Sequence, residues 1–259
     1  MEEKSPRLNR VLERLRQRKP FTGVLVTMPS VTATQVWARS GIDVLVFDLE
    51  HAPIDITSLH AVIAATAGSP ALPIVRVPWN LPWLVKPVLD AGALGIQFPM
   101  VATAADAEAA VRAMKYPPTG ERGWGPFYAP LRWDVSWQRY VEVANDEVMT
   151  VLLIERPEAV ANIRDIVRVP GVDMLMIAPF DLAITSGYPN RRDHPDVVRA
   201  VREVEDVVLA SGIPLGGVAL DANAANAMID RGYLGLFVGY DWMVLQRGAA
   251  ALLEGINLG

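Results

Sequence analysis

The chain alternates between short apolar segments and longer segments with helical spacing along nearly its whole length. The apolar segments are continuous rather than alternating in polarity, which is typical of strands in a parallel sheet that is covered on both faces. Residues 21–28 (FTGVLVTM) are the first such segment, and residues 30–41 are predicted as the helix that follows. Ser30 is a candidate N-cap for that helix and Gly41 is a candidate stop.

Roughly eight strand–helix units of this kind fit in the chain, which is the number found in a closed (β/α)₈ barrel. The sequence therefore predicts an α/β fold, a TIM barrel formed by one domain over residues 1–259, with an N-terminal helix and a C-terminal helix. A doubly wound open sheet is the alternative. No G-x-G-x-x-G motif follows the first strand, which argues against dinucleotide binding. The other predicted strands are residues 42–50, 72–78, 94–100, 148–155, 172–179, 213–220 and 233–240.

Composition excludes several classes of function. The net charge is -5 and no basic cluster is present, so nucleic acid is not an expected partner. The absence of cysteine excludes disulfides, thiolate catalysis and cysteine-ligated zinc. Residues 1–20 are highly charged and lack the apolar core of a signal peptide, and no apolar run approaches the length of a membrane span. We therefore expect a cytoplasmic protein with no membrane association.

Residues 117–146 interrupt the alternation, and this segment is predicted to be irregular. It contains Trp124, Trp133 and Trp137. A long segment without regular pattern is usually functional or part of an interface, so we interpret it as an interface or an active-site lid. The alternative is a loop that packs on its own aromatic side chains.

Ionisable side chains follow several of the predicted strands. The second strand ends in Asp48, Glu50 and His51, and the third ends in Arg76; the fourth, fifth and sixth end near Gln97, Glu155 and Asp181. In a barrel of this kind the active site lies at the carboxyl ends of the strands. These side chains are therefore expected to lie together at that end of the barrel, which we call its mouth.

The types of these side chains suggest a metal site. Glu155 and Asp181 follow strands that are neighbours in the predicted barrel, and two carboxylates with open positions suit a divalent ion such as Mg²⁺ or Mn²⁺. Arg76 can clamp a substrate carboxylate with two hydrogen bonds, and His51 can exchange a proton near neutral pH.

Each of these residues also has a structural alternative. Glu155 can be a charge favoured by a helix dipole, because Pro157 is a candidate first helical residue. Asp181 can be a helix cap, and Arg76 can be a buried partner of Asp48. His60 and His194 are interpreted as structural or solvated, and Asp221 as a helix N-cap.

Five segments in the same order resemble the HpcH/HpaI aldolase family of metal-dependent class II pyruvate aldolases. The resemblance extends from about residue 20 to residue 245. The segments are FDLEHAPID, PIVRVPWN, YPPTGERGWGP, LLIERPEAVANI and GVDMLMIAPFDLAITSG.

This resemblance implies a TIM barrel whose C-terminal helix packs on a neighbouring subunit of a homo-oligomer, commonly a hexamer built as a trimer of dimers. It implies a divalent cation, Mg²⁺, Mn²⁺ or Co²⁺, held by Glu155 and Asp181. The implied reaction is the reversible cleavage of a 4-hydroxy-2-oxo acid to pyruvate, or a related 2-oxo acid, and an aldehyde.

The resemblance also assigns roles to individual residues. Arg76 matches the arginine that polarises the keto oxygen of the substrate and stabilises the enolate. His51 matches the histidine of the acid/base machinery, Asp90 matches its acidic partner, and Asp48 matches a further active-site acid near a subunit boundary. Neither Lys86 nor Lys115 lies at a strand end, in agreement with a mechanism that needs no Schiff base.

Four positions depart from the usual pattern of the family. Leu153 stands where a Gln is frequent, and Arg156 where a Thr or Ser is usual. Ala178 and Phe180 replace small residues beside the expected position of the keto acid. These substitutions leave two alternatives open: decarboxylation of a 2-oxo diacid such as oxaloacetate, or a barrel that binds a keto acid without turnover.

Overall fold

Eight parallel strands close into a barrel in a computed structural model of the chain, which describes residues 8–256. Each strand pairs with the next along the chain, and the last pairs with the first. The predicted α/β barrel is confirmed, and the open sheet is ruled out. Residues 1–7 and 257–259 of the predicted domain lie outside the described residues. The strands are β1 (Phe21–Val26), β2 (Val44–Asp48), β3 (Leu72–Arg76), β4 (Gly95–Phe98), β5 (Met149–Ile154), β6 (Met174–Ile177), β7 (Leu215–Val218) and β8 (Gly235–Tyr240).

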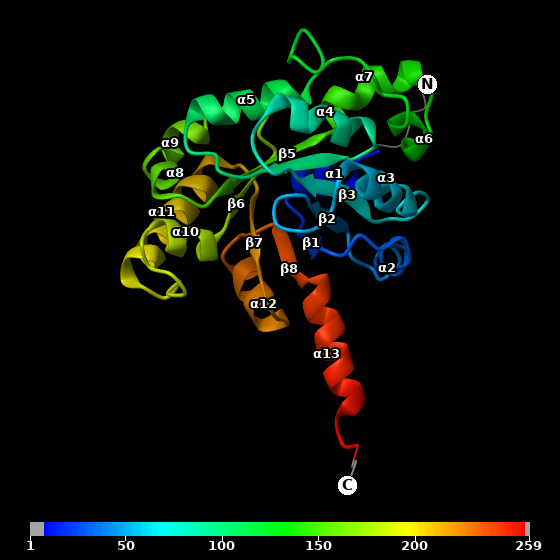
Figure 1. Cartoon of the computed structure of the whole chain (residues 1–259). Helices are drawn as coiled ribbons and strands as arrows, with labels where there is room; N and C mark the ends of the chain where they lie inside the picture. Colours follow the sequence, from blue (N-terminus) through cyan, green and yellow to red (C-terminus); the bar gives the residue numbers. More distant parts are fainter. Residues whose placement is uncertain (1–7, 257–259) are drawn as a thin grey trace.

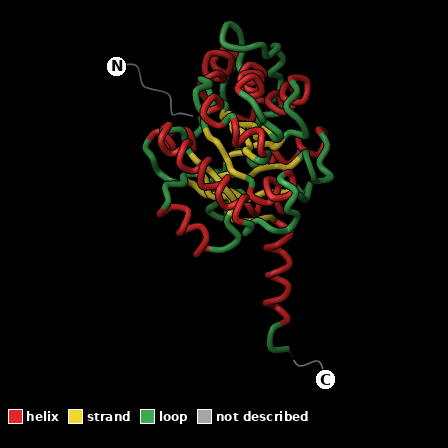
Figure 2. Tube along the Cα trace, turned by 90° about the vertical axis from the view of Figure 1, so that its left-hand side faces the viewer, coloured by secondary structure: helices red, strands yellow, loops and turns green. Residues whose placement is uncertain are grey.

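Helices surround the strands, as Figures 1 and 2 show. The predicted N-terminal and C-terminal helices are present as α1 (Arg10–Arg16) and α13 (Asp241–Leu253). The helices between them are α2 (Val31–Trp37), α3 (Ile56–Ala65), α4 (Pro82–Asp90), α5 (Ala104–Met114), α6 (Ala129–Trp133), α7 (Trp137–Glu147), α8 (Pro157–Ala161), α9 (Ile163–Ile166), α10 (Pro179–Thr185), α11 (Pro195–Ser211) and α12 (Ala222–Asp230).

Capping residues set several of the helix boundaries. The Ser30 side chain accepts a hydrogen bond from the backbone N–H of Ala33, as predicted for a helix N-cap. Gly41 adopts a positive φ of 94°, a left-handed conformation that ends the unit at little steric cost. Asp221 likewise caps α12 by accepting from the N–H of Ala224.

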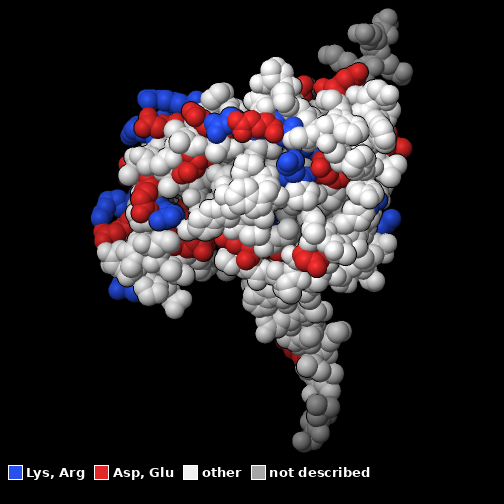
Figure 3. Space-filling model, turned by 45° about the horizontal axis from the view of Figure 1, so that its top comes forward, with Lys and Arg blue, Asp and Glu red and all other residues white. Residues whose placement is uncertain are grey.

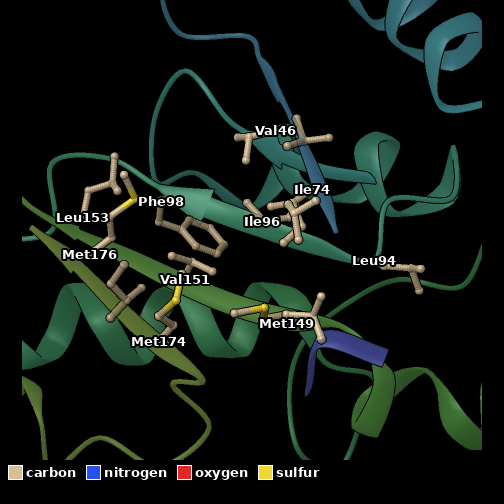
Figure 4. Packing of buried hydrophobic residues seen from close by; sticks show 14 of the residues in the cluster. Val46, Ile74, Leu94, Ile96, Phe98, Met149, Val151, Leu153, Met174 and Met176 are labelled. Carbon is tan, nitrogen blue, oxygen red and sulfur yellow. The ribbon is translucent and has the colours of Figure 1, made fainter. Parts of the chain in front are cut away.

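Strand register places the functional side chains inside the barrel. Residues paired across parallel strands share a face, and Asp48 is paired with Arg76, which is paired in turn with Gln97. The Nε2 atom of Gln97 lies 3.3 Å from the sulfur of Met176 on β6, so this face points into the barrel. Figure 4 shows part of the buried core, with Ile74, Phe98 and Met176 from three different strands among the labelled side chains.

The prediction that residues 117–146 are irregular is wrong in part. The segment contains α6 and the greater part of α7, and α7 begins where Ser136 accepts a hydrogen bond from the N–H of Arg139. Aromatic and β-branched residues conceal the helical spacing in the sequence. Trp133 is buried and its indole N–H donates to the carbonyl of Gly92, whereas the rings of Trp124 and Trp137 are half exposed. The predicted interface or lid role of this segment stays a prediction.

The helix α13 extends away from the barrel, as Figures 1 and 2 show. Asp241, its first residue, is its only buried residue among those described. Leu245, Leu252 and Leu253 are 64%, 80% and 64% exposed. On the face seen in Figure 3 the helix is almost free of charge. Among residues 8–256, no helix is both long and apolar enough to cross a bilayer.

Candidate active site

A forked ion pair joins the ends of β2 and β3. Arg76 donates from Nε to Oδ1 of Asp48 at 2.8 Å and from Nη2 to Oδ2 at 2.7 Å. Asp48 is buried, and its Oδ1 atom also accepts the backbone N–H of Glu50 at 3.0 Å. Burial disfavours the charged guanidinium, but the hydrogen bonds and charge of Asp48 outweigh it and raise the pKa of Arg76. The arginine is therefore a fixed cation at the barrel mouth.

Glu50 and His51 continue the mouth from β2. The Oε2 atom of Glu50 lies 3.2 Å from Nε of Arg76 and 3.6 Å from Nε2 of His51. Burial raises the pKa of Glu50 to about 7, and the Asp48 and Asp181 carboxylates add to this, although Arg76 opposes it. The His51 side chain is 63% exposed, so it is accessible to a molecule in the mouth.

Glu155 follows β5 and is almost fully buried. Its Oε1 atom accepts a short hydrogen bond from the backbone N–H of Met100. Met100 holds a positive φ of 60°, a conformation that is strained for a residue with a side chain. Burial raises the pKa of Glu155 to about 7; the N–H of Met100 opposes this shift, and the Glu50 and Asp181 carboxylates add to it.

Asp181 lies in the first turn of α10, directly after β6. The N–H of Ala178 donates to the carbonyl of Ile154 on β5, so this N–H group is not available to a ligand. The N–H groups of Phe180 and Asp181 belong to the first turn and have no acceptor within the helix. The Arg192 guanidinium lies 4.7 Å from the centre of the Phe180 ring, which is partly exposed.

Three carboxylates, Glu50, Glu155 and Asp181, share the mouth; Asp181 raises the pKa of both Glu50 and Glu155, and Glu50 raises that of Glu155. The nearby cation, Arg76, makes both of its hydrogen bonds to Asp48. The buried Oε2 atom of Glu50 lies 3.2 Å from Nε of Arg76 but has no hydrogen bond among the described residues. An excess of buried negative charge is stabilised by a bound cation. The donors are oxygen atoms, which suits a hard divalent ion. The residues present therefore fit such an ion.

The protein ligands for that ion are few. Within residues 8–256, no three His, Asp or Glu side chains gather closely enough to ligate one ion. A site with two carboxylate ligands leaves several positions of an octahedron open to water and substrate.

Asp90 does not lie with the other predicted residues. It is the last residue of α4, a helix of nine residues that begins shortly after Arg76, so about 12 Å of helix separates it from the mouth. Its Oδ1 atom accepts a 2.7 Å hydrogen bond from Arg122, which is fully buried. The expected pairing of Asp90 with His51 is therefore not made within one chain: the α4 helix carries the two side chains apart.

The two remaining histidines have structural contacts. His60 on α3 lies 3.1 Å from a guanidinium nitrogen of Arg132 and packs edge-on against Tyr128. His194 caps α11 by accepting from the N–H of Asp196. Neither has a recorded contact with the residues of the mouth.

Two residues of the mouth have a part that the sequence did not predict. Glu50 was expected at the mouth but was given no role, and it lies between Arg76 and His51, two residues beyond the end of β2. Tyr240 ends β8, and its hydroxyl interacts electrostatically with Arg76, Asp181 and Asp48. No sequence motif marks Tyr240.

Comparison with known proteins agrees with this geometry. The family model described as HpcH/HpaI aldolase/citrate lyase matches residues 23–247. A hydroxypyruvate/pyruvate aldolase from Roseovarius nubinhibens is 37% identical over 85% of this chain and 86% of its own length. A 4-hydroxy-2-oxo-heptane-1,7-dioate aldolase from Klebsiella pneumoniae is 34% identical over 94% of this chain and 92% of its own. The crystal structure of an HpcH/HpaI aldolase/citrate lyase family protein from Burkholderia cenocepacia superposes with a TM-score of 0.89 at 34% identity, covering 95% and 98% of the two chains.

The closed parallel barrel, with carboxylates and a paired arginine at the carboxyl ends of its strands, has the architecture of an α/β-barrel enzyme. The chain belongs to the HpcH/HpaI aldolase/citrate lyase family, and it is a carbon–carbon lyase, an aldolase, of that family. The predicted family is confirmed, and a barrel that only binds keto acids is not supported.

Proposed function

We propose that the chain is a divalent-metal-dependent aldolase that cleaves a 4-hydroxy-2-oxo acid to pyruvate, or a related 2-oxo acid, and an aldehyde. The observation that carries the proposal is the forked Arg76–Asp48 pair in the same mouth as Glu155 and Asp181. The two relatives are named as aldolases of hydroxypyruvate and pyruvate and of a 4-hydroxy-2-oxo diacid, which supports this class of substrate.

Glu155 and Asp181 would hold the cation, Mg²⁺, Mn²⁺ or Co²⁺. When bound, such an ion supplies Lewis-acid stabilisation for the enolate of the 2-oxo acid. The N–H of Met100 fixes the Glu155 carboxylate. The N–H groups of Phe180 and Asp181 at the start of α10 are free to receive the substrate carboxylate, with Ala178 preceding them at the strand end.

Arg76 would stabilise the enolate oxygen. Asp48 occupies its Nε and Nη2 atoms, whereas Nη1 has no recorded partner within the described residues. The donor is held in place before substrate arrives, so it costs no reorganisation as charge develops. In the cleavage direction the bond between C3 and C4 breaks, and its electron pair becomes the enolate.

His51 would take the proton from the 4-hydroxyl group in cleavage and return it in addition. It is exposed at the mouth and its nearest acid in the chain is Glu50. The role of Asp90 as acidic partner of His51 requires a second copy of the chain, since Asp90 is bound to Arg122 at the far end of α4.

We propose a homo-oligomer, a hexamer formed as a trimer of dimers, in which α13 packs on a neighbouring subunit. The helix exposes Leu245, Leu252 and Leu253, and Asp241 is its only buried residue among those described. A helix of 13 residues is marginal in water without tertiary contacts. A second copy would bury this apolar surface.

Decarboxylation of a 2-oxo diacid is the second candidate, because it passes through the same enolate. Leu153 and Phe180 place apolar side chains at positions that are usually polar or small in the family. This change favours a mouth that selects a different substrate from the usual aldolase substrates.

Deuterium exchange into the methyl group of pyruvate, followed by NMR, tests the proposal without any aldehyde. We expect exchange with Mg²⁺, Mn²⁺ or Co²⁺ and none with EDTA. Exchange that is absent with every metal, in protein shown to be folded by circular dichroism, would refute enolate chemistry on pyruvate. Release of CO₂ from oxaloacetate would then be measured as the alternative.

A further inference from the structure

A bulge in β8 sets the direction of Tyr240. On β1 the pairing with β8 advances two positions, from Gly23 to Leu25, whereas on β8 it advances three, from Phe237 to Tyr240. One extra residue is thus inserted into β8. Gly239 lies within the insertion with a positive φ of 92°, a backbone conformation that favours glycine. Bulges of this kind redirect side chains at barrel rims.

The bulge turns Tyr240 into the barrel. Leu25 is paired with Tyr240 on one side and with Val46 on the other, so these three share a face. Val46 is two residues before Asp48 on β2, and residues two apart in a strand lie on the same face. Tyr240 therefore points to the interior, as Asp48 does. Without the bulge, Gly239 would take this position and the tyrosine would point outward to the helices.

The order of the strands places Tyr240 across the mouth from Arg76 and Glu155. Arg76 ends β3 and Glu155 follows β5, and β8 is three strands away from each of them around the closed barrel. The Tyr240 ring packs beside that of Trp242, with 6.2 Å between centroids and 29° between planes. A substrate held by Arg76 that reaches across the mouth would place its far end on this side of the barrel.

The hydroxyl of Tyr240 is a free, neutral donor. It makes no hydrogen bond within residues 8–256, and the residue is partly exposed. Burial raises the pKa of Tyr240; Arg76 opposes this shift, and the Asp181 and Asp48 carboxylates add to it. The phenol therefore keeps its proton at neutral pH.

We propose that Tyr240 is a catalytic residue whose hydroxyl donates a hydrogen bond to the C4 oxygen, on the aldehyde side of the bond that breaks. This inference rests on the proposed aldolase function and deepens it. In the addition direction, C3 of the enolate attacks the aldehyde carbon, and the π electron pair of the C–O bond moves to the oxygen. The O–H of Tyr240 stabilises the resulting alkoxide until the alkoxide is protonated through His51. In cleavage the same donor stabilises the alkoxide while the bond between C3 and C4 breaks. Tyr240 keeps its own proton throughout.

Tyr240→Phe tests the proposal because it removes the hydroxyl and keeps the ring. Two rates are compared in each protein: exchange of the pyruvate methyl protons, which needs no aldehyde, and cleavage of a 4-hydroxy-2-oxo acid. We expect kcat/KM for cleavage to fall roughly 10²-fold, as for loss of an oxyanion donor, and at least tenfold more than exchange. Pyruvate affinity, measured by calorimetry in the presence of Mn²⁺, should be unchanged.

Tyr233→Phe is the matched control. Tyr233 precedes β8, and its hydroxyl donates to the buried carboxylate of Glu205, at the opposite end of the strand from Tyr240. This control should leave the ratio of cleavage to exchange unchanged even if it lowers stability. Equal losses of both rates in Tyr240→Phe, or no loss of cleavage, would overturn the proposal for Tyr240. Wild-type protein without metal-dependent exchange would instead overturn the aldolase function itself.

Discussion

Asp48 and Arg76, which are paired in register at the ends of β2 and β3, form a two-point ion pair with separations of 2.8 and 2.7 Å. A lysine cannot reproduce this fork, because its ammonium group is a point charge. We expect Arg76→Lys to lower kcat/KM for cleavage by roughly 10²–10³, the usual effect of losing an oxyanion donor. Steady-state kinetics measures this, and a loss below about threefold would remove Arg76 from the mechanism.

The same pair predicts a stability effect. Arg76→Met leaves the buried Asp48 carboxylate without its partner, and breaking a buried ion pair from one side costs about 3–5 kcal/mol. The double variant Asp48→Asn, Arg76→Met should recover part of this loss, since no uncompensated charge remains. Urea denaturation of both variants provides the comparison. A double variant less stable than Arg76→Met alone would show that the ion pair is not the source of the loss.

The metal assignment predicts that Glu155→Gln and Asp181→Asn each weaken Mn²⁺ binding at least tenfold. Each variant removes a charge and keeps the size of the side chain. Isothermal titration calorimetry gives the affinity directly, independent of activity. The control is Glu158→Gln, an exposed carboxylate three residues after Glu155 that pairs with Arg156. Unchanged affinity in both site variants would place the metal elsewhere.

The raised pKa values predict how stability depends on pH. Glu50 and Glu155 have pKa values of about 7 in the folded chain against an ordinary value of 4.5. The unfolded chain therefore releases these protons first, and their contribution to stability is lost as pH rises from about 4.5 through 7. We expect the melting temperature in EDTA to fall between pH 5 and pH 8 by about a few degrees.

Added Mn²⁺ should reverse this trend, because the ion binds the ionised carboxylates and its affinity grows with pH. Glu155→Gln is the matched variant: its melting temperature in EDTA should vary less with pH than that of the wild type. A melting temperature in EDTA that rises steadily over this range would contradict the assignment of the buried, protonated carboxylates.

If the exposed apolar face of α13 holds the subunits together, a charged side chain on that face should dissociate the oligomer. Leu245→Glu and Leu252→Glu place a carboxylate in the proposed contact with a second copy, so the mass measured by light scattering should fall toward that of one chain. Gln246→Glu adds the same charge on the same exposed helix and is the control. A wild-type chain that is monomeric at micromolar concentration would contradict the oligomer directly.

The sequence by itself determined the architecture. Continuous apolar strands that alternate with helices allow few arrangements, because each strand must be buried on both faces. Once the barrel is predicted, its carboxyl ends collect Asp48, Arg76, Glu155 and Asp181 into one mouth. The order of the elements along the chain is sufficient for this step, since neighbouring units in the sequence are neighbours in space.

Only the tertiary structure decided which of these side chains meet. Asp90 is close to the mouth in the chain order, but α4 carries it away to a buried arginine, Arg122. The direction of the Tyr240 side chain depends on one residue inserted into β8 where it pairs with β1, because the insertion turns the side chain from the outside of the barrel to the inside. Periodicity along one segment cannot reveal either outcome. A contact depends on register and direction relative to strands formed elsewhere, and a shift of one residue exchanges the inside of a barrel with its outside.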